Sequence, residues 1–316
     1  MAEIFYIKKR DVSIITFLVA FFRPLFYNGI MGLIFLLLVI VGFILTNLPM
    51  KLGMLRGYGS LALTGALFWI GGLLSLVFLF VSGQSLHLSI PVVALAVAGG
   101  IGGAAAYFCF INALRIGHYA LTISVLTMSF LLPVLYSSLF WGVSLKALMV
   151  AGIVLIMAGI VLISFSGSAR QAGEKKNRWK WVLWISAAFC LNGIPQISQA
   201  AAKTRLGGVS DWLYLFIVFF SGGLVYAVVL GVRRISVPGK AWIFAAAAGA
   251  ASVAANLFTL KTLETIPATV VFPVTLTGPV IGGVLLSRFV FREKMDRTAW
   301  FGILAGIAGL VLLTLR

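Results

Sequence analysis

The stretch Arg170–Lys180 reads Arg-Gln-Ala-Gly-Glu-Lys-Lys-Asn-Arg-Trp-Lys and is the only long polar run of the sequence. It holds five basic residues and one acid, and apolar segments flank it on both sides. Each segment is about 20 residues long, which is the length of helix that crosses the hydrocarbon core of a bilayer. The sequence therefore predicts two membrane-embedded halves joined by one basic connector.

Composition supports a membrane protein and excludes a soluble one. The chain is 62% hydrophobic and 10% charged, whereas soluble proteins carry roughly 25% charged residues. The apolar segments are continuous rather than alternating, which favours helices over a β-barrel. The net charge of +17 comes from loop residues that meet lipid headgroups, so membrane lipids rather than nucleic acid are the predicted partner. Cys109 and Cys190 fall inside apolar spans and are interpreted as packing residues.

We predict an all-α polytopic protein of about ten transmembrane helices, arranged as two five-helix repeats. The first repeat covers 30–169, the connector 170–180 and the second repeat 181–316. Residues 1–29 form an N-terminal extension that is an interfacial helix, an extra span, or sequence ahead of the true start at Met31. The predicted spans are 30–50, 61–82, 91–113, 121–142, 146–166, 179–202, 211–232, 240–262, 268–290 and 298–315.

The two halves repeat the same small residues at matching places. Gly152 and Gly159 recur with the same spacing as Gly302 and Gly309, and Pro133 has a counterpart in Pro279. The pair Gly71-Gly72 recurs as Gly222-Gly223. An odd number of spans per repeat inserts the second half upside down, and inverted repeats of this kind are typical of secondary transporters.

Charge predicts the orientation of the chain. Most Lys and Arg lie in the loops that follow the odd-numbered spans, including the connector. The positive-inside rule then places connector 170–180 in the cytoplasm. We expect a multi-pass protein of the cytoplasmic membrane.

The sequence resembles the EamA-like, ten-helix branch of the drug/metabolite transporter superfamily. The resemblance is carried by a small-residue third span, a short link, a fourth span with a central proline and a glycine-rich fifth span. These stand as 113–120, Leu132-Pro133 and Ala151-Gly152, and recur as 262–268, Gly278-Pro279 and Phe291-Arg292-Glu293-Lys294 before the last span. It covers residues 30–316 and implies a transporter fold with alternating access.

Uncharged polar residues inside the spans are the candidate substrate pathway. Asn192, Gln196 and Gln199 share one face of the sixth span, and Ser252, Asn256 and Thr259 repeat that spacing in the eighth. Asn47, Trp69, Tyr107 and Asn112 add amide and aromatic groups from the first half. Amides offer both donors and acceptors, which suits a neutral or zwitterionic metabolite. The bland alternative for each amide is a hydrogen bond that only joins helices.

Other residues carry further hypotheses. Pro133, Pro195 and Pro279 each free a backbone carbonyl and are interpreted as hinges or breaks that line a cavity. Lys261 and Glu264 are either a snorkelling pair at the interface or a gate or ion-coupling site. Gly302 and Gly306 form a Gly-x-x-x-Gly pattern that packs the tenth span on the fifth or on a second copy, so the chain is a monomer or a homodimer.

The predicted function is a secondary transporter, an exporter of a small polar metabolite such as an amino acid. A flippase for a lipid-linked headgroup is the alternative transport reading. An intramembrane enzyme and a non-transporting subunit rank lower, because no His-Glu-x-x-His motif and no acid in mid-span are present. No phosphate-binding loop exists either, and we expect no cofactor, no metal and no catalytic residue.

Overall fold

The computed structural model describes residues 31–83, 89–116, 119–165, 178–206, 210–289 and 297–314, all of which are helical or in short links. The predicted extension 1–29 and most of the connector lie outside these ranges. Seven helices are long and apolar enough to cross a membrane, and three shorter apolar stretches lie at 147–163, 268–282 and 300–313. The prediction of an all-α polytopic fold with about ten spans is therefore confirmed.

The first described helix is Met31–Leu55. The others match the predicted spans within a few residues, except that the fourth span is built from α4, a short 3₁₀ segment η1 and α5 in succession. The sixth span, α7, begins at Arg178, so the last residues of the predicted connector belong to this helix. The bounds are α2 Ser60–Val81, α3 Ile90–Ile116, α4 Tyr119–Thr127, η1 Met128–Phe130, α5 Leu131–Trp141, α6 Ala147–Phe165, α7 Arg178–Ala201, a π-helical segment η3 Ala202–Leu206, α8 Asp211–Val232, α9 Ala241–Leu263, α10 Ala268–Phe289 and α11 Arg297–Thr314.

Local sequence explains where several helices begin and end. Gly142 ends α5 in the left-handed conformation, with φ of 66°, and its position lets the Val143 N–H reach the carbonyl of Ser137. Ser210 caps α8 by accepting a hydrogen bond from the Leu213 N–H at 3.3 Å. Asp211 follows in the first turn of α8, where a carboxylate interacts favourably with the helix dipole.

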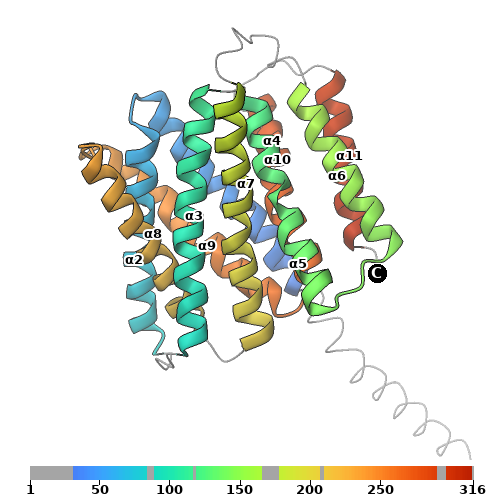
Figure 1. Cartoon of the computed structure of the whole chain (residues 1–316), viewed down its shortest axis with the longest axis horizontal. Helices are drawn as coiled ribbons and strands as arrows, with labels where there is room; N and C mark the ends of the chain where they lie inside the picture. Colours follow the sequence, from blue (N-terminus) through green and yellow to red (C-terminus); the bar gives the residue numbers. More distant parts are fainter. Residues whose placement is uncertain are drawn as a thin grey trace, which may run out of the picture.

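Helix α6 packs against α11 through glycines that approach in a reciprocal pattern. A Cβ added to Gly159 would lie 2.6 Å from the Gly302 carbonyl oxygen, and one added to Gly309 would lie 2.6 Å from that of Gly152. The pairs are therefore Gly152 with Gly309 and Gly159 with Gly302, which is the exchange that a two-fold axis between repeats produces. Figure 1 shows α6 and α11 side by side at one edge of the bundle.

Helices α2 and α8 repeat this reciprocity at the other side of the molecule. A Cβ on Gly71 would meet the ring of Phe219, and one on Gly222 would meet the ring of Phe68. A Cβ on Gly223 would meet the ring of Trp69, and one on Gly72 would meet the backbone of Phe220. The two rings Phe68 and Phe219 also pack on each other, with centroids 5.9 Å apart. The inverted relation of the two halves is therefore present in their packing, while the exact repeat boundaries stay a prediction.

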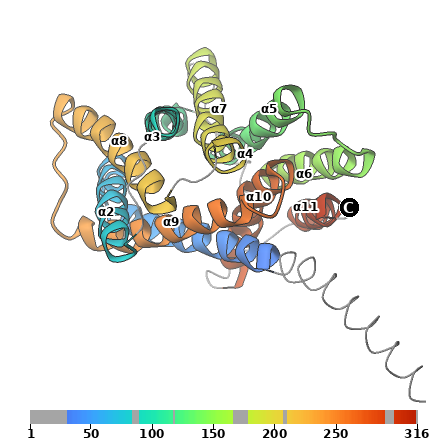
Figure 2. The ribbon, with the colours of Figure 1, turned by 90° about the horizontal axis from the view of Figure 1, so that it is seen from below.

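Two large buried apolar clusters result, besides a smaller one between α3 and α7, and α7 lies at the boundary between the two large ones. One cluster draws mainly on α2, α3, α8 and α9, and the other on α5, α6, α10 and α11. Ala200 of α7 joins the second cluster, and Ala202, two residues later in η3, joins the first. Figure 2 shows α2 and α8 on one side of the bundle and α6 and α11 on the other, with α4 and α7 between them.

Substituting Gly159 with alanine tests the α6–α11 contact. The added methyl would meet the Gly302 carbonyl and the Gly306 backbone, and overpacking of this kind costs about 1–3 kcal/mol. Thermal unfolding of the detergent-purified protein should show a lower midpoint for Gly159→Ala.

The matched control for this test is Gly231→Ala on α8. A Cβ at Gly231 would have no neighbour within 4 Å, so alanine there adds helix propensity, worth up to about 1 kcal/mol, at no steric cost. Equal midpoints for the two variants would contradict the close packing described for α6 and α11.

Candidate functional site

Polar side chains of α7 form a hydrogen-bonded seam at the boundary between the two apolar clusters. We call this set of residues, Ser129, Asn192, Gln196, Gln199, Ser252 and Asn256, the polar seam. Asn192 Nδ2 donates to Ser129 Oγ at 2.7 Å, and Gln196 Nε2 donates to the same oxygen at 3.3 Å. Ser129 belongs to η1, in the first half of the chain, so the seam joins the two halves.

A second group of contacts continues the seam toward α9. Gln199 Nε2 donates to Asn256 Oδ1 at 2.7 Å, and Asn256 Nδ2 donates to the Ser252 carbonyl at 2.8 Å. The two polar stripes of the sixth and eighth spans, which the sequence placed on separate helices, are therefore in direct contact. Thr259 does not take part, because its hydroxyl donates to the Ala255 carbonyl of its own helix at 2.9 Å.

One fully buried acceptor of the seam is left without a donor in the described residues. Gln196 is only 6% exposed, and its Oε1 has no hydrogen-bond partner in the described part of the chain. A buried carbonyl oxygen without a donor costs about 1–3 kcal/mol. Such an exception calls for a specific explanation, which can be a bound water or a ligand.

Proline explains why the helix geometry changes at Ser129. Pro133 has no N–H, so the carbonyl four residues before it, that of Ser129, loses its usual donor. The chain adopts 3₁₀ geometry over Met128–Phe130 at this point, and the Ser129 side chain is fully buried. The position of Ser129 one turn before Pro133 was the sequence signal that could have added it to the candidate list.

The other two candidate prolines lie inside helices. Pro195 is in α7 between Asn192 and Gln196, and Pro279 is in α10 after a further proline, Pro273. Each removes one backbone hydrogen bond from its helix. Their interpretation as hinges or cavity-lining breaks stays a prediction.

The four candidates from the first half lie outside the polar seam. Asn47 is exposed on its helix, Trp69 packs on Phe220 with centroids 5.7 Å apart, and Tyr107 is 44% exposed. Asn112 Nδ2 donates to the Phe108 carbonyl of its own helix at 2.8 Å. Within the described residues none of these contacts reaches the seam, so their place in a substrate pathway also stays a prediction.

Four charged residues form an ion network where α7, α8 and α9 meet at one end of the bundle. Lys203 Nζ lies 2.5 Å from Asp211 Oδ1 and 2.7 Å from Glu264 Oε1. Lys261 Nζ lies 2.8 Å from Asp211 Oδ2 and 3.2 Å from Glu264 Oε1. The predicted pair Lys261–Glu264 is thus half of a larger network, whose buried centre is Asp211, only 5% exposed.

The π-helical segment η3 aims Lys203 into this network. π-Helical turns often occur at functional sites, because the extra residue rotates the side chains that follow. Arg205 of the same segment donates to the Trp141 carbonyl at 3.0 Å and lies over the Trp141 ring at 5.3 Å. Segment η3 is therefore tied to the ends of α5, α8 and α9.

The sequence of the first half does not repeat the two carboxylates of this network. The glycine pairs Gly71/Gly222 and Gly72/Gly223 place Ser60 where the second half has Asp211, and the matching of the short links places Arg115 opposite Glu264. Lys51 is equivalent to Lys203. The two positions of the first half that correspond to Asp211 and Glu264 therefore carry no carboxylate.

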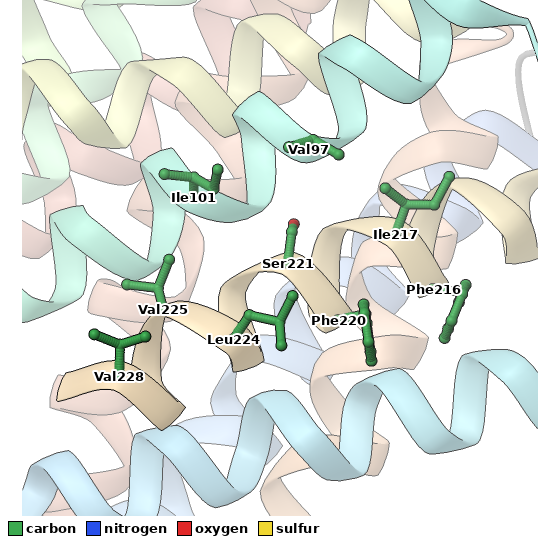
Figure 3. A pocket seen from close by; sticks show the side chains of 9 residues that line it. All are labelled: Val97, Ile101, Phe216, Ile217, Phe220, Ser221, Leu224, Val225 and Val228. Carbon is green, nitrogen blue, oxygen red and sulfur yellow. The ribbon is translucent and has the colours of Figure 1, made fainter. Parts of the chain in front are cut away.

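A separate apolar pocket opens between α3 and α8, with a volume of about 450 Å³. Figure 3 shows its lining, in which Ser221 is the one polar side chain among nine. The Ser221 hydroxyl already donates to the Val218 carbonyl at 3.1 Å. This pocket offers nothing to orient a polar solute and is distinct from the polar seam.

The absence of a bound metal was also expected from the sequence and stays a prediction. No group of three or more His, Cys, Asp and Glu side chains that could hold a metal ion lies in the described ranges. The absence of a cofactor stays a prediction.

Comparisons with known proteins agree with the fold and the resemblance. Residues 178–315 match the model of the EamA-like transporter family. A solved structure described only as "Crystal structure of protein" is 21% identical, with a TM-score of 0.71, and the match covers 92% of this chain and 96% of that one. At this identity the likeness shows the fold alone. No curated protein matches the sequence.

The match of residues 178–315 to the EamA-like transporter model and the all-helical membrane fold are consistent with a membrane transporter of the drug/metabolite type. The match of the second half agrees with the resemblance found in the sequence. Members of this family are transporters rather than enzymes. The match begins at residue 178, so the repeat character of the first half rests on the reciprocal contacts of α2 with α8 and of α6 with α11.

The exposure of the two carboxylates predicts which one holds the ion network together. Asp211→Asn leaves two lysines sharing only the half-exposed Glu264, and breaking a buried ion pair costs about 3–5 kcal/mol. Glu264→Gln removes a carboxylate that is 42% exposed, which is worth about 1 kcal/mol or less. Thermal unfolding in detergent should therefore show a much larger loss for Asp211→Asn. Similar losses in both variants would mean that Asp211 is not the centre of the network.

Proposed function

We propose that this protein is a secondary carrier that moves a small polar solute across the cytoplasmic membrane by alternating access. The observation that carries the proposal is the polar seam with its unpartnered Gln196 Oε1. The seam lies where the two halves meet, and substrate sites of inverted-repeat transporters lie at this kind of interface near the bilayer midplane.

The energies favour a ligand site over a purely structural role. Hydrogen bonds between membrane helices contribute about 0.6 kcal/mol on average. The unpartnered carbonyl oxygen of Gln196 costs about 1–3 kcal/mol, which offsets the gain from several such bonds. Apolar side chains would join the helices without that cost. If side chains of the seam form hydrogen bonds with a bound solute, the presence of polar residues at this place is explained.

The ion network supports a gate at one end of this pathway. Opening that end would separate η3 from α8 and α9 and so break the contacts of Lys203 with Asp211 and Glu264. With connector 170–180 in the cytoplasm, as the charge pattern predicts, the network faces the outside. A gate held closed on the outside leaves the cytoplasmic end as the loading side, and for this reason we propose export.

The proposal predicts that Gln199 is reachable by water from both sides of the membrane in turn. Gln199 is 7% exposed, so access to it requires that the halves rearrange. In sealed vesicles, Gln199→Cys in a Cys109→Ala, Cys190→Ala background should react with a membrane-impermeant thiol reagent added to either side. Full-length protein is used throughout, and no substrate needs to be known.

The matched control is Ala188→Cys on the same helix. Ala188 is fully buried in a separate apolar cluster, so this cysteine should stay unreactive from both sides. Labelling of position 199 from one side only, or from neither, would refute alternating access through the polar seam.

A further inference from the structure

We propose that the polar seam selects its solute by hydrogen-bond donors, which the side-chain carbonyl oxygens of Gln196 and Gln199 accept. This inference rests on the proposed function and names the class of solute: a molecule with several N–H or O–H groups and no carboxylate at the end that enters the seam. The sequence alone left this open, because an amide can donate as well as accept.

The orientation of the Gln196 amide follows from its neighbours. One end of the amide lies 2.8 Å from the backbone carbonyl oxygen of Asn192. A carbonyl oxygen only accepts, so the atom facing it has to be the nitrogen. The same nitrogen lies 3.3 Å from Ser129 Oγ, which uses its second hydrogen. Both N–H groups of Gln196 are thus occupied, and Oε1 remains as the free group.

The orientation of the Gln199 amide is fixed through Asn256. Asn256 Nδ2 lies 2.8 Å from the Ser252 carbonyl oxygen, so the other end of the Asn256 amide is an oxygen. Gln199 then has to turn its nitrogen toward that oxygen, at a distance of 2.7 Å. Its own Oε1 faces away from Asn256, and in the described residues it has no hydrogen-bond partner.

The two free oxygens lie close along one helix. Residues 196 and 199 are three apart, which corresponds to a rise of about 4.5 Å along α7 on the same side. Both side chains are more than nine-tenths buried, at 6% and 7% exposure. Two such carbonyl dipoles, of which that of Gln196 is fully buried, attract ammonium or hydroxyl groups and repel a carboxylate.

The carboxylates of the described network are not available to balance a cation in the seam. Asp211 and Glu264 are both occupied by Lys203 and Lys261. The property that the seam recognises is therefore a hydrogen-bond donor. Both an amine and an alcohol carry such a donor, and a comparison of the two separates these sources.

The test uses four compounds with the same four-carbon skeleton: 1,4-diaminobutane, 1,4-butanediol, 1,4-dimethoxybutane and succinate. Each is titrated to millimolar concentrations against the detergent-purified full chain, and the thermal midpoint is recorded. We expect the diamine, the diol or both to raise the midpoint, while the ether and the dicarboxylate leave it unchanged. The stronger of the first two identifies the ammonium or the hydroxyl source.

The variants Gln196→Met and Gln199→Met keep side-chain length and remove the acceptor. Each should weaken the apparent affinity for the active compound about tenfold, measured as a shift relative to the same variant without ligand. Thr46→Val is the matched control, because its buried hydroxyl bonds only the Gly42 carbonyl of its own helix, at 2.9 Å. This control should keep the wild-type affinity.

Stabilisation by succinate or by the ether equal to that by the donors would overturn the proposal, as would no stabilisation by any donor. Retention of full affinity in both methionine variants would also overturn it. These failures differ from a failure of the proposed function, which shows as one-sided labelling of Gln199→Cys in the absence of any solute.

Discussion

Close backbone contact between the two halves is the constraint on which the rest of this structure depends. Lipid chains are as apolar as leucine, so membrane helices gain nothing from hiding apolar surface from each other and associate through close packing. Here the glycines of α6 and α11 bring carbonyl oxygens of one helix into the space that a side chain of the other would fill. Because the halves are inverted copies, each such contact is made twice. The glycines of α2 and α8 receive aromatic rings of the facing helix in the same reciprocal manner. Helix α7 is left at the boundary between the two large apolar clusters.

The apolar packing obeys the repeat symmetry, whereas the polar groups break it. Phe68 and Phe219 pack as equivalents, but Asp211 stands where the first half has Ser60. The polar seam takes Ser129 from the first half and its amides from the second. Symmetric packing gives a scaffold that can rock about its axis, and asymmetric polar groups give its two ends different properties. This division of roles fits a carrier whose two sides work under different conditions.

Hydrogen bonds that look structural also orient the groups that are left over. The Asn192 backbone carbonyl fixes the orientation of the Gln196 amide. The Ser252 carbonyl fixes that of Asn256, which in turn fixes that of Gln199. In both glutamines the nitrogen is used by these partners, and the side-chain oxygen points away from them. A carrier has to release its solute, so a few unpaired neutral acceptors suit the task better than a buried charge, which would hold a counter-ion tightly. The four charged residues of the ion network stand instead at one end of the bundle, outside the seam.

The sequence by itself indicated the spans, their number, the inverted repeat and the family resemblance. The length of an apolar segment and the spacing of repeated glycines can both be seen in the order of the residues. The sequence also found both polar stripes, since Asn192, Gln196 and Gln199 follow helical spacing. It did not find Ser129, Lys203 or Asp211, which reach the site only because η1, η3 and the start of α8 meet other helices in space. Which amide atoms stay free was equally hidden, because that depends on carbonyl groups that only the packed helices bring within 3 Å. Local chemistry can be read along a chain, but the pairing of donors with acceptors is decided by tertiary structure.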